Sequence, residues 1–158
     1  MKFSSTVLVT RDMAAARRFY EELLDQEIAM DLGENLSFKS GFALQACTLW
    51  AQLIGKAESD IQTGRDDCEL YFEEPEFDAF IRRLEGFSVR YAHPPYEQPW
   101  GQRAVRFYDP DGHLIEVGES MSAAVRRMGQ QGMSAEEICR RTSYPMPFIQ
   151  ASLEGQEL

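Results

Sequence analysis

Histidine and cysteine, which often hold metals or build covalent frameworks, are scarce in this chain. Only two histidines and three cysteines occur among its 158 residues. The odd number and wide spacing of Cys47, Cys68 and Cys139 exclude both a disulfide framework and a zinc knuckle. No apolar run approaches the ~20 residues of a membrane-spanning helix, and the N-terminus lacks the apolar region of a signal peptide. We therefore expect a cytoplasmic protein.

Positively charged residues are also fewer than negatively charged ones. The chain has 16 Lys and Arg against 26 Asp and Glu, which gives a net charge of −10 at pH 7. Nucleic acids and anionic membranes require a basic surface, so neither is an expected partner. Apolar residues make up 44% and charged residues 27% of the chain, which are ordinary values for a globular protein and exclude disorder throughout.

The first fifty residues predict one helix among four strands. Residues 3–10 are rich in Val and Thr, as strands are. From Met13 to Leu24 apolar residues recur at helical spacing, and Asp12 before them is a suitable N-cap. Turn residues then separate three strand-like segments, at 27–32, 35–39 and 42–47.

The same order returns after the polar, glycine-bounded segment 55–67. We predict a strand at 68–74, a helix at 75–84, a strand at 87–91, a proline-rich loop at 93–99, and strands at 103–108 and 114–118. A pattern that recurs is stronger evidence than any single element. The sequence therefore predicts an α+β fold with two βαβββ repeats, at about 1–54 and 66–120, forming one curved mixed sheet with a concave pocket.

The last part of the chain has a different character. Residues 121–158 contain four Arg and four Glu, so their net charge is zero. Helices are expected at 119–130, 135–142 and 146–153, and Ser134 with Glu137 forms a capping-box pattern. A helix-turn-helix that binds DNA would need positive charge that is missing here. We expect a helical extension at 121–158 after a domain at 1–120.

Two segments carry a resemblance to a known superfamily. Residues 7–24 contain a strand, then Asp12, then Phe19-Tyr20, and residues 100–117 contain the turn Asp109-Pro110-Asp111-Gly112 before Ile115-Glu116. With the repeat, residues 1–120 resemble the vicinal-oxygen-chelate superfamily, which includes glyoxalase I, bleomycin-resistance proteins and extradiol dioxygenases. The resemblance implies a divalent metal on the concave face and a homodimer.

The positions that match the superfamily's metal ligands are Ser5, Gln45, Glu69 and Glu116. None carries an imidazole, which disfavours the iron chemistry of dioxygenases. The oxygen donors of Gln45, Glu69 and Glu116 suit hard cations. The resemblance implies Mn, Mg, Ni or Zn as the metal, and the residues leave open a pocket with no metal in which Glu116 accepts bonds from Arg103 or Arg106.

Strand alternation predicts which side chains face the concave side. It places Glu69 with Tyr71 on one strand, and Arg106 with Tyr108 on another. Arg106 beside carboxylates is either a clamp for an anionic ligand or half of an internal salt bridge. The predicted catalytic pair is Glu69 and Glu116, and the predicted ligand-binding residues are Tyr71, His93, Trp100, Arg106 and Tyr108.

Two functions from different classes fit these residues. The first is a metal-assisted lyase or isomerase that resembles lactoylglutathione lyase and acts on a small carbonyl-containing metabolite. The second is a metal-free protein that sequesters an aromatic or cationic drug, as bleomycin-resistance proteins do. A sensor that signals through the helical extension is a third hypothesis. A small molecule is the expected ligand in each case.

Overall fold

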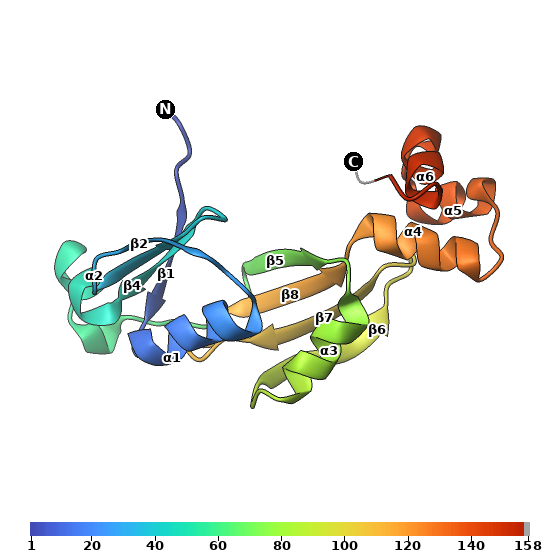
Figure 1. Ribbon diagram of the computed structural model, residues 1–158. Helices are drawn as coiled ribbons and strands as arrows, with labels where there is room; N and C mark the ends of the chain where they lie inside the picture. The colour runs from blue at the N-terminus through green and yellow to red at the C-terminus, as the bar shows by residue number, and fades with distance from the viewer. Residues whose placement is uncertain (157–158) are drawn as a thin grey trace. The chain divides into compact units, whose positions relative to one another are not determined.

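The strands of the computed structural model, which describes residues 1–156, form two four-stranded sheets (Figure 1). Their orders are β1-β4-β3-β2 and β5-β8-β7-β6, so each repeat has the same arrangement. The α+β class and the two βαβββ repeats are thereby confirmed. Hydrogen bonds join the strands as two sheets, one from each repeat, rather than as one continuous sheet.

Residue contacts divide the chain into two compact units, which are described separately below. The first unit contains Met1–Leu70, Phe87–Arg90 and Phe107–Leu114. The second contains Tyr71–Gly86, Tyr91–Arg106 and Ile115–Leu158. The first unit therefore includes the turn between the last two strands of the second repeat. The predicted division at residue 120 into a domain and an extension stays a prediction.

The first sheet combines one parallel and two antiparallel pairs. Its strands are β1 Thr6–Thr10, β2 Ile28–Asp31, β3 Asn35–Phe38 and β4 Phe42–Ala46. β1 runs parallel to β4 with Leu8 opposite Leu44, whereas β2, β3 and β4 form an antiparallel meander. The parallel pair requires a long crossover, which the helix and the two intervening strands supply.

The helix predicted over 13–24 packs its apolar stripe on the first sheet. It begins as α1 (Met13–Arg18) and continues as the π-helix η1 (Phe19–Leu23). The Asp12 side chain accepts a hydrogen bond from the Ala15 amide at 3.0 Å, as expected of the N-cap. Tyr20 is fully buried, and its ring contacts Phe38 and Phe42.

One helix of the first repeat is absent from the sequence prediction. The sequence predicts a strand over 42–47, but β4 ends at Ala46 and α2 occupies Cys47–Leu53. Cys47 and Ala51 are buried, one helical turn apart, and they cluster with Ile61. The 3-10 helix η2 (Glu58–Asp60) lies in the predicted linker. A helix of two turns offers too short a period to recognise from sequence.

The second sheet contains β5 (Glu69–Glu74), β6 (Arg90–Glu97), β7 (Arg103–Tyr108) and β8 (Leu114–Glu119), with α3 (Phe77–Glu85) following β5. The prediction of a strand at 87–91 and a loop at 93–99 is wrong, because β6 runs through Pro94 and Pro95. β6 is an edge strand of this sheet. An edge strand tolerates proline because one side of its backbone needs no partner.

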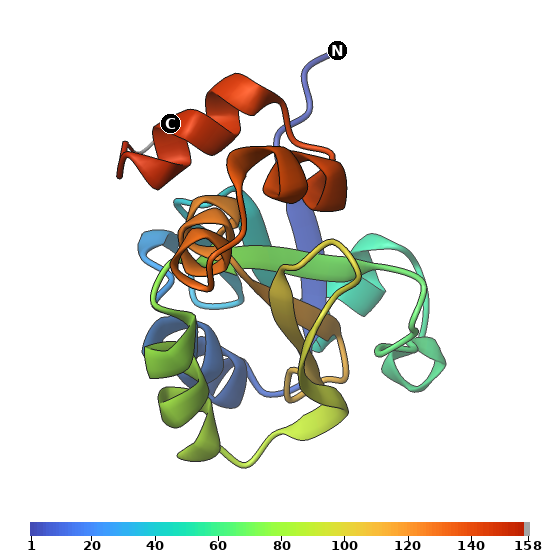
Figure 2. The same cartoon turned by 90° about the vertical axis from the view of Figure 1, so that its right-hand side faces the viewer.

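Three helices form the C-terminal part of the second unit, shown in orange to red in Figures 1 and 2: α4 (Met121–Gln130), α5 (Ala135–Thr142) and α6 (Met146–Leu153). The capping box of Ser134 and Glu137 is present in both directions. Val125, Met128, Ile138 and Ile149 form a buried cluster among them. No helix within residues 1–156 has the length and apolarity needed to span a membrane.

Candidate functional site

A charged group occupies one face of the second sheet. Arg106 on β7 forms an ion pair with Glu116 on β8, and the two side chains are 25% and 5% exposed. His93 on β6 places Nε2 3.3 Å from Arg106 Nη1 and Nδ1 2.9 Å from the Pro94 carbonyl oxygen. A carbonyl only accepts, so Nδ1 carries the proton and Nε2 accepts from the arginine.

Aromatic rings lie on the same face, where a buried amide holds their polar ends. Gln102 Nε2 donates to the Tyr71 hydroxyl at 2.8 Å, and its Oε1 accepts from Trp100 Nε1 at 3.1 Å. Burial raises the pKa of Tyr71 to about 12, with Glu73 adding to the rise and Gln102 opposing it. Tyr71 remains 47% exposed and Trp100 41% exposed. Both rings are thus anchored yet open to a ligand.

Gly118 on β8 makes room for this arrangement. A Cβ atom at this position would lie 2.8 Å from Gln102 Nε2 and 3.1 Å from the ring of Tyr71. Gly118 and Glu116 are two residues apart on one strand and so share a face. We call the surface formed by Tyr71, His93, Trp100, Arg106 and Glu116 the ligand face.

Replacing Gly118 by alanine should displace the Gln102 amide and release the indole of Trp100. We expect overpacking to lower the free energy of unfolding by about 1–3 kcal/mol, and the emission of Trp100 to change. The measurement is urea denaturation followed by fluorescence. Gly86→Ala is the matched control, because Gly86 is exposed at the end of α3 and has a negative φ. Equal stability of the two variants would contradict the crowding at Gly118.

The other predicted site residues, Gln45, Glu69 and Tyr108, belong to the first unit. Gln45 is 6% exposed; its Oε1 accepts from Asn35 and its Nε2 donates to the Glu34 carbonyl. The Tyr108 hydroxyl donates to Asp66 at 2.8 Å. Glu69 is exposed at the start of β5. The structure brings together Arg106, Glu116 and His93, and joins Tyr71 to Trp100 through Gln102; the catalytic and binding roles stay predictions.

The residues at the four superfamily ligand positions do not fit a metal. The Glu116 carboxylate is engaged by Arg106, and both ends of the Gln45 amide are bonded within the first sheet. Ser5 is exposed and donates to the Thr6 carbonyl. Across residues 1–156 no three His, Cys, Asp or Glu side chains are grouped so that they could hold an ion. A carboxylate with a permanent guanidinium partner is a poor ligand for a second cation.

Sequence reasoning missed Gln102 and Gly118, which organise the aromatic part of the ligand face. Gln102 follows Trp100 by two residues, but nothing in that spacing predicts that its amide joins Trp100 to a tyrosine 31 residues earlier. Glycine in a strand often marks a close approach of another group. The glycine at 118 was therefore the one available signal, and it lay directly beside the predicted Glu116.

Comparison with known proteins agrees with this architecture. The model of the glyoxalase-like domain family matches residues 3–122, and the chain belongs to that family. A protein of unknown function from Agrobacterium tumefaciens is 37% identical with a TM-score of 0.68, over 76% of this chain and 94% of its own. No curated protein sequence matches the chain.

Two further solved structures share the fold and have named activities. A lactoylglutathione lyase from Agrobacterium tumefaciens is 25% identical with a TM-score of 0.57, over 76% of this chain and 94% of its own. A fosfomycin resistance protein from Mesorhizobium loti is 18% identical with a TM-score of 0.56, over 75% of this chain and 92% of its own. The same fold thus occurs in a lyase and in a drug-resistance protein.

Proposed function

We propose that this protein binds a planar small molecule on the ligand face without the help of a metal. The observation that carries the proposal is the ion pair of Arg106 with the buried Glu116. In this ion pair Arg106 occupies the Glu116 carboxylate, to which the superfamily resemblance assigns a metal. The half-exposed rings of Tyr71 and Trp100 offer surfaces on which an aromatic ligand can stack.

The charge of the chain favours a cationic ligand over an anionic one. The net charge of −10 raises the local concentration of cations around the protein. Sequestration of an aromatic or cationic drug therefore accounts for the residues better than metal-assisted lyase chemistry does. One protein that shares the fold, the fosfomycin resistance protein from Mesorhizobium loti, is named for resistance to a drug. The homodimer expected from the resemblance stays a prediction.

Metal content and ligand binding together test this function. After exposure to Mn²⁺, Ni²⁺ and Zn²⁺ and extensive dialysis, we expect elemental analysis to find no stoichiometric metal in the wild type or in Glu116→Gln. Proflavine, a planar aromatic cation, should bind and quench Trp100 fluorescence. Trp100→Ala should weaken binding about three- to tenfold, the value of one stacking contact. Trp50→Phe, outside the ligand face, is the matched control.

Two results would count against the proposal. Stoichiometric metal in the wild type that is lost in Glu116→Gln would establish the metal-assisted alternative, because Glu116 would then be a ligand. Equal proflavine affinity in Trp100→Ala and the wild type would remove the ligand face from the binding site. Circular dichroism of each variant separates these results from a loss of folding.

A further inference from the structure

A second candidate binding site lies in the first unit, in a cavity of about 460 Å³. Small-molecule sites typically have volumes of about 300–1,000 Å³. The cavity is formed where the start of η1, the start of β6 and the turn between β7 and β8 come together. Its apolar wall includes Phe19, Val89 and Pro110, and its polar wall includes Arg90 and Tyr108. Neither Arg90 nor any residue of the apolar wall belongs to the ligand face.

Arg90 provides a positive charge that the protein does not neutralise. Its guanidinium carbon lies 3.4 Å from the centroid of the Tyr108 ring, a stacked cation–π geometry. Within the part of the chain that the structure describes, the Arg90 guanidinium has no hydrogen-bond or ion-pair partner. The Tyr108 ring is itself held, because its hydroxyl donates to Asp66. The guanidinium is thus oriented while its N–H donors remain available.

The two carboxylates in the lining of the cavity are committed elsewhere. Asp109 is 5% exposed and accepts bonds from the Tyr20 hydroxyl and the His113 ring. Asp111 accepts from the Thr10 hydroxyl and the Arg11 amide. Their oxygens already accept bonds from these other partners, and neither carboxylate forms an ion pair with Arg90 within the described residues.

We propose that this cavity binds the carboxylate of a small ligand that has an apolar body. The planar fork of an arginine matches a carboxylate with two parallel hydrogen bonds. Stacking on Tyr108 fixes the plane of the Arg90 guanidinium, so the side chain loses little rotational freedom when the anion binds. The apolar body then packs against Phe19, Val89 and Pro110. This site is independent of the function proposed for the ligand face.

Benzoate and benzamide are suitable probes because they share a shape and differ in charge. We expect benzoate to shift the backbone amide signals of Phe19, Val89 and Gly112 in a nuclear magnetic resonance titration. Benzamide should bind at least about tenfold more weakly, because it lacks the charge-assisted bonds. Arg90→Gln should weaken benzoate binding by at least about tenfold for the same reason. Arg82→Gln, which removes an exposed arginine of α3, should leave it unchanged.

Several outcomes would overturn the proposal. One is that neither benzoate nor 3-phenylpropanoate shifts these signals. Another is equal binding of benzoate by the wild type and Arg90→Gln, or an equal loss in Arg82→Gln. Inorganic phosphate binding more tightly than benzoate would exclude a ligand with an apolar body. Thermal denaturation of Arg90→Gln and Arg82→Gln shows whether each variant is still folded. Tyr108→Leu, which removes the ring on which Arg90 stacks, should also weaken benzoate binding.

Discussion

Replacing Asp109 by alanine is expected to lower the free energy of unfolding by about 3–5 kcal/mol, the cost of removing one partner from a buried charged network. The carboxylate is almost fully buried in the turn after β7. It accepts from the Tyr20 hydroxyl at 2.9 Å, from the His113 ring at 2.8 Å, and from the amides of Asp111 and His113. Without the carboxylate these donors lose their acceptor, and a buried donor that has no acceptor destabilises the folded state.

The network around Asp109 also joins parts of the chain that are far apart in sequence. Tyr20 comes from the first repeat, and the turn belongs to the second. Asp111 in the same turn accepts from Thr10 and Arg11 at the end of β1. The loss of Asp109 should therefore loosen the whole first unit and not the turn alone.

Urea denaturation of Asp109→Ala measures this loss, and the titration of His113 gives a second reading. Burial lowers the pKa of His113, but the hydrogen bond with Asp109 and its charge outweigh burial, so the pKa lies above its ordinary value. In Asp109→Asn the pKa of His113 should fall. Asp67→Ala, at an exposed aspartate, is the control. An unchanged His113 pKa in Asp109→Asn would contradict the network.

Replacing Glu119 by glutamine should be the second most damaging change, with an expected loss of about 3 kcal/mol at pH 7. The Glu119 side chain is 3% exposed and lies between Arg103, at 3.0 Å, and Arg127, at 2.8 Å. Arg127 belongs to α4, so this buried carboxylate connects the C-terminal helices to β8. Glutamine would remove the buried charge from between the two guanidinium groups, which would keep ion pairs only with the more exposed Asp78 and Glu97.

The effect should depend on pH in a defined direction. Burial raises the pKa of Glu119, but the hydrogen bonds and charges of Arg127 and Arg103 outweigh it, so the pKa is lowered from 4.5. A group with a depressed folded pKa stabilises fully above its unfolded pKa and loses that contribution as pH falls through the folded value. The difference between wild type and Glu119→Gln should therefore be largest at neutral pH and shrink below about pH 4.5.

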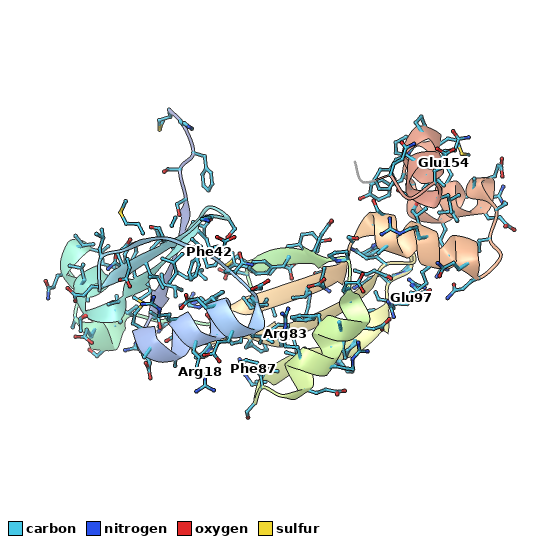
Figure 3. The ribbon with its side chains drawn as sticks, in the orientation of Figure 1. Arg18, Phe42, Arg83, Phe87, Glu97 and Glu154 are labelled. Carbon is cyan, nitrogen blue, oxygen red and sulfur yellow. The ribbon has the colours of Figure 1, made fainter. Side chains whose placement is uncertain are left out.

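Denaturation at several pH values between 7 and 3 measures this dependence. Glu97, which Figure 3 labels, provides the matched control. It also accepts from Arg127 and from Arg141, but its side chain is 37% exposed. Exposed pairs contribute little, so Glu97→Gln should cost no more than about 1 kcal/mol. A loss in Glu119→Gln that stayed constant down to pH 3 would show that charge is not its cause.

Local patterns in the sequence determined the features that depend on contacts between residues close together in the chain. The Asp12 cap and the Ser134–Glu137 capping box formed as expected, because a cap bonds to amides two or three residues away. The alternation in β5 also holds, since the pleat alone sends neighbouring side chains to opposite faces. The helices at 135–142 and 146–153 also have the predicted bounds.

Only the tertiary structure decided the features that depend on distant neighbours. Pro94 and Pro95 lie in a strand because β6 is at the edge of its sheet, a position that no local pattern specifies. The choice between a clamp and an internal salt bridge for Arg106 depended on where Glu116 lies, and the ion pair is what the fold forms. Gln102 and Gly118 both meet Tyr71 of β5, and Arg90 stacks on Tyr108 of β7. Side-chain contacts between strands are set by sheet pairing, which brings together residues that the sequence keeps apart.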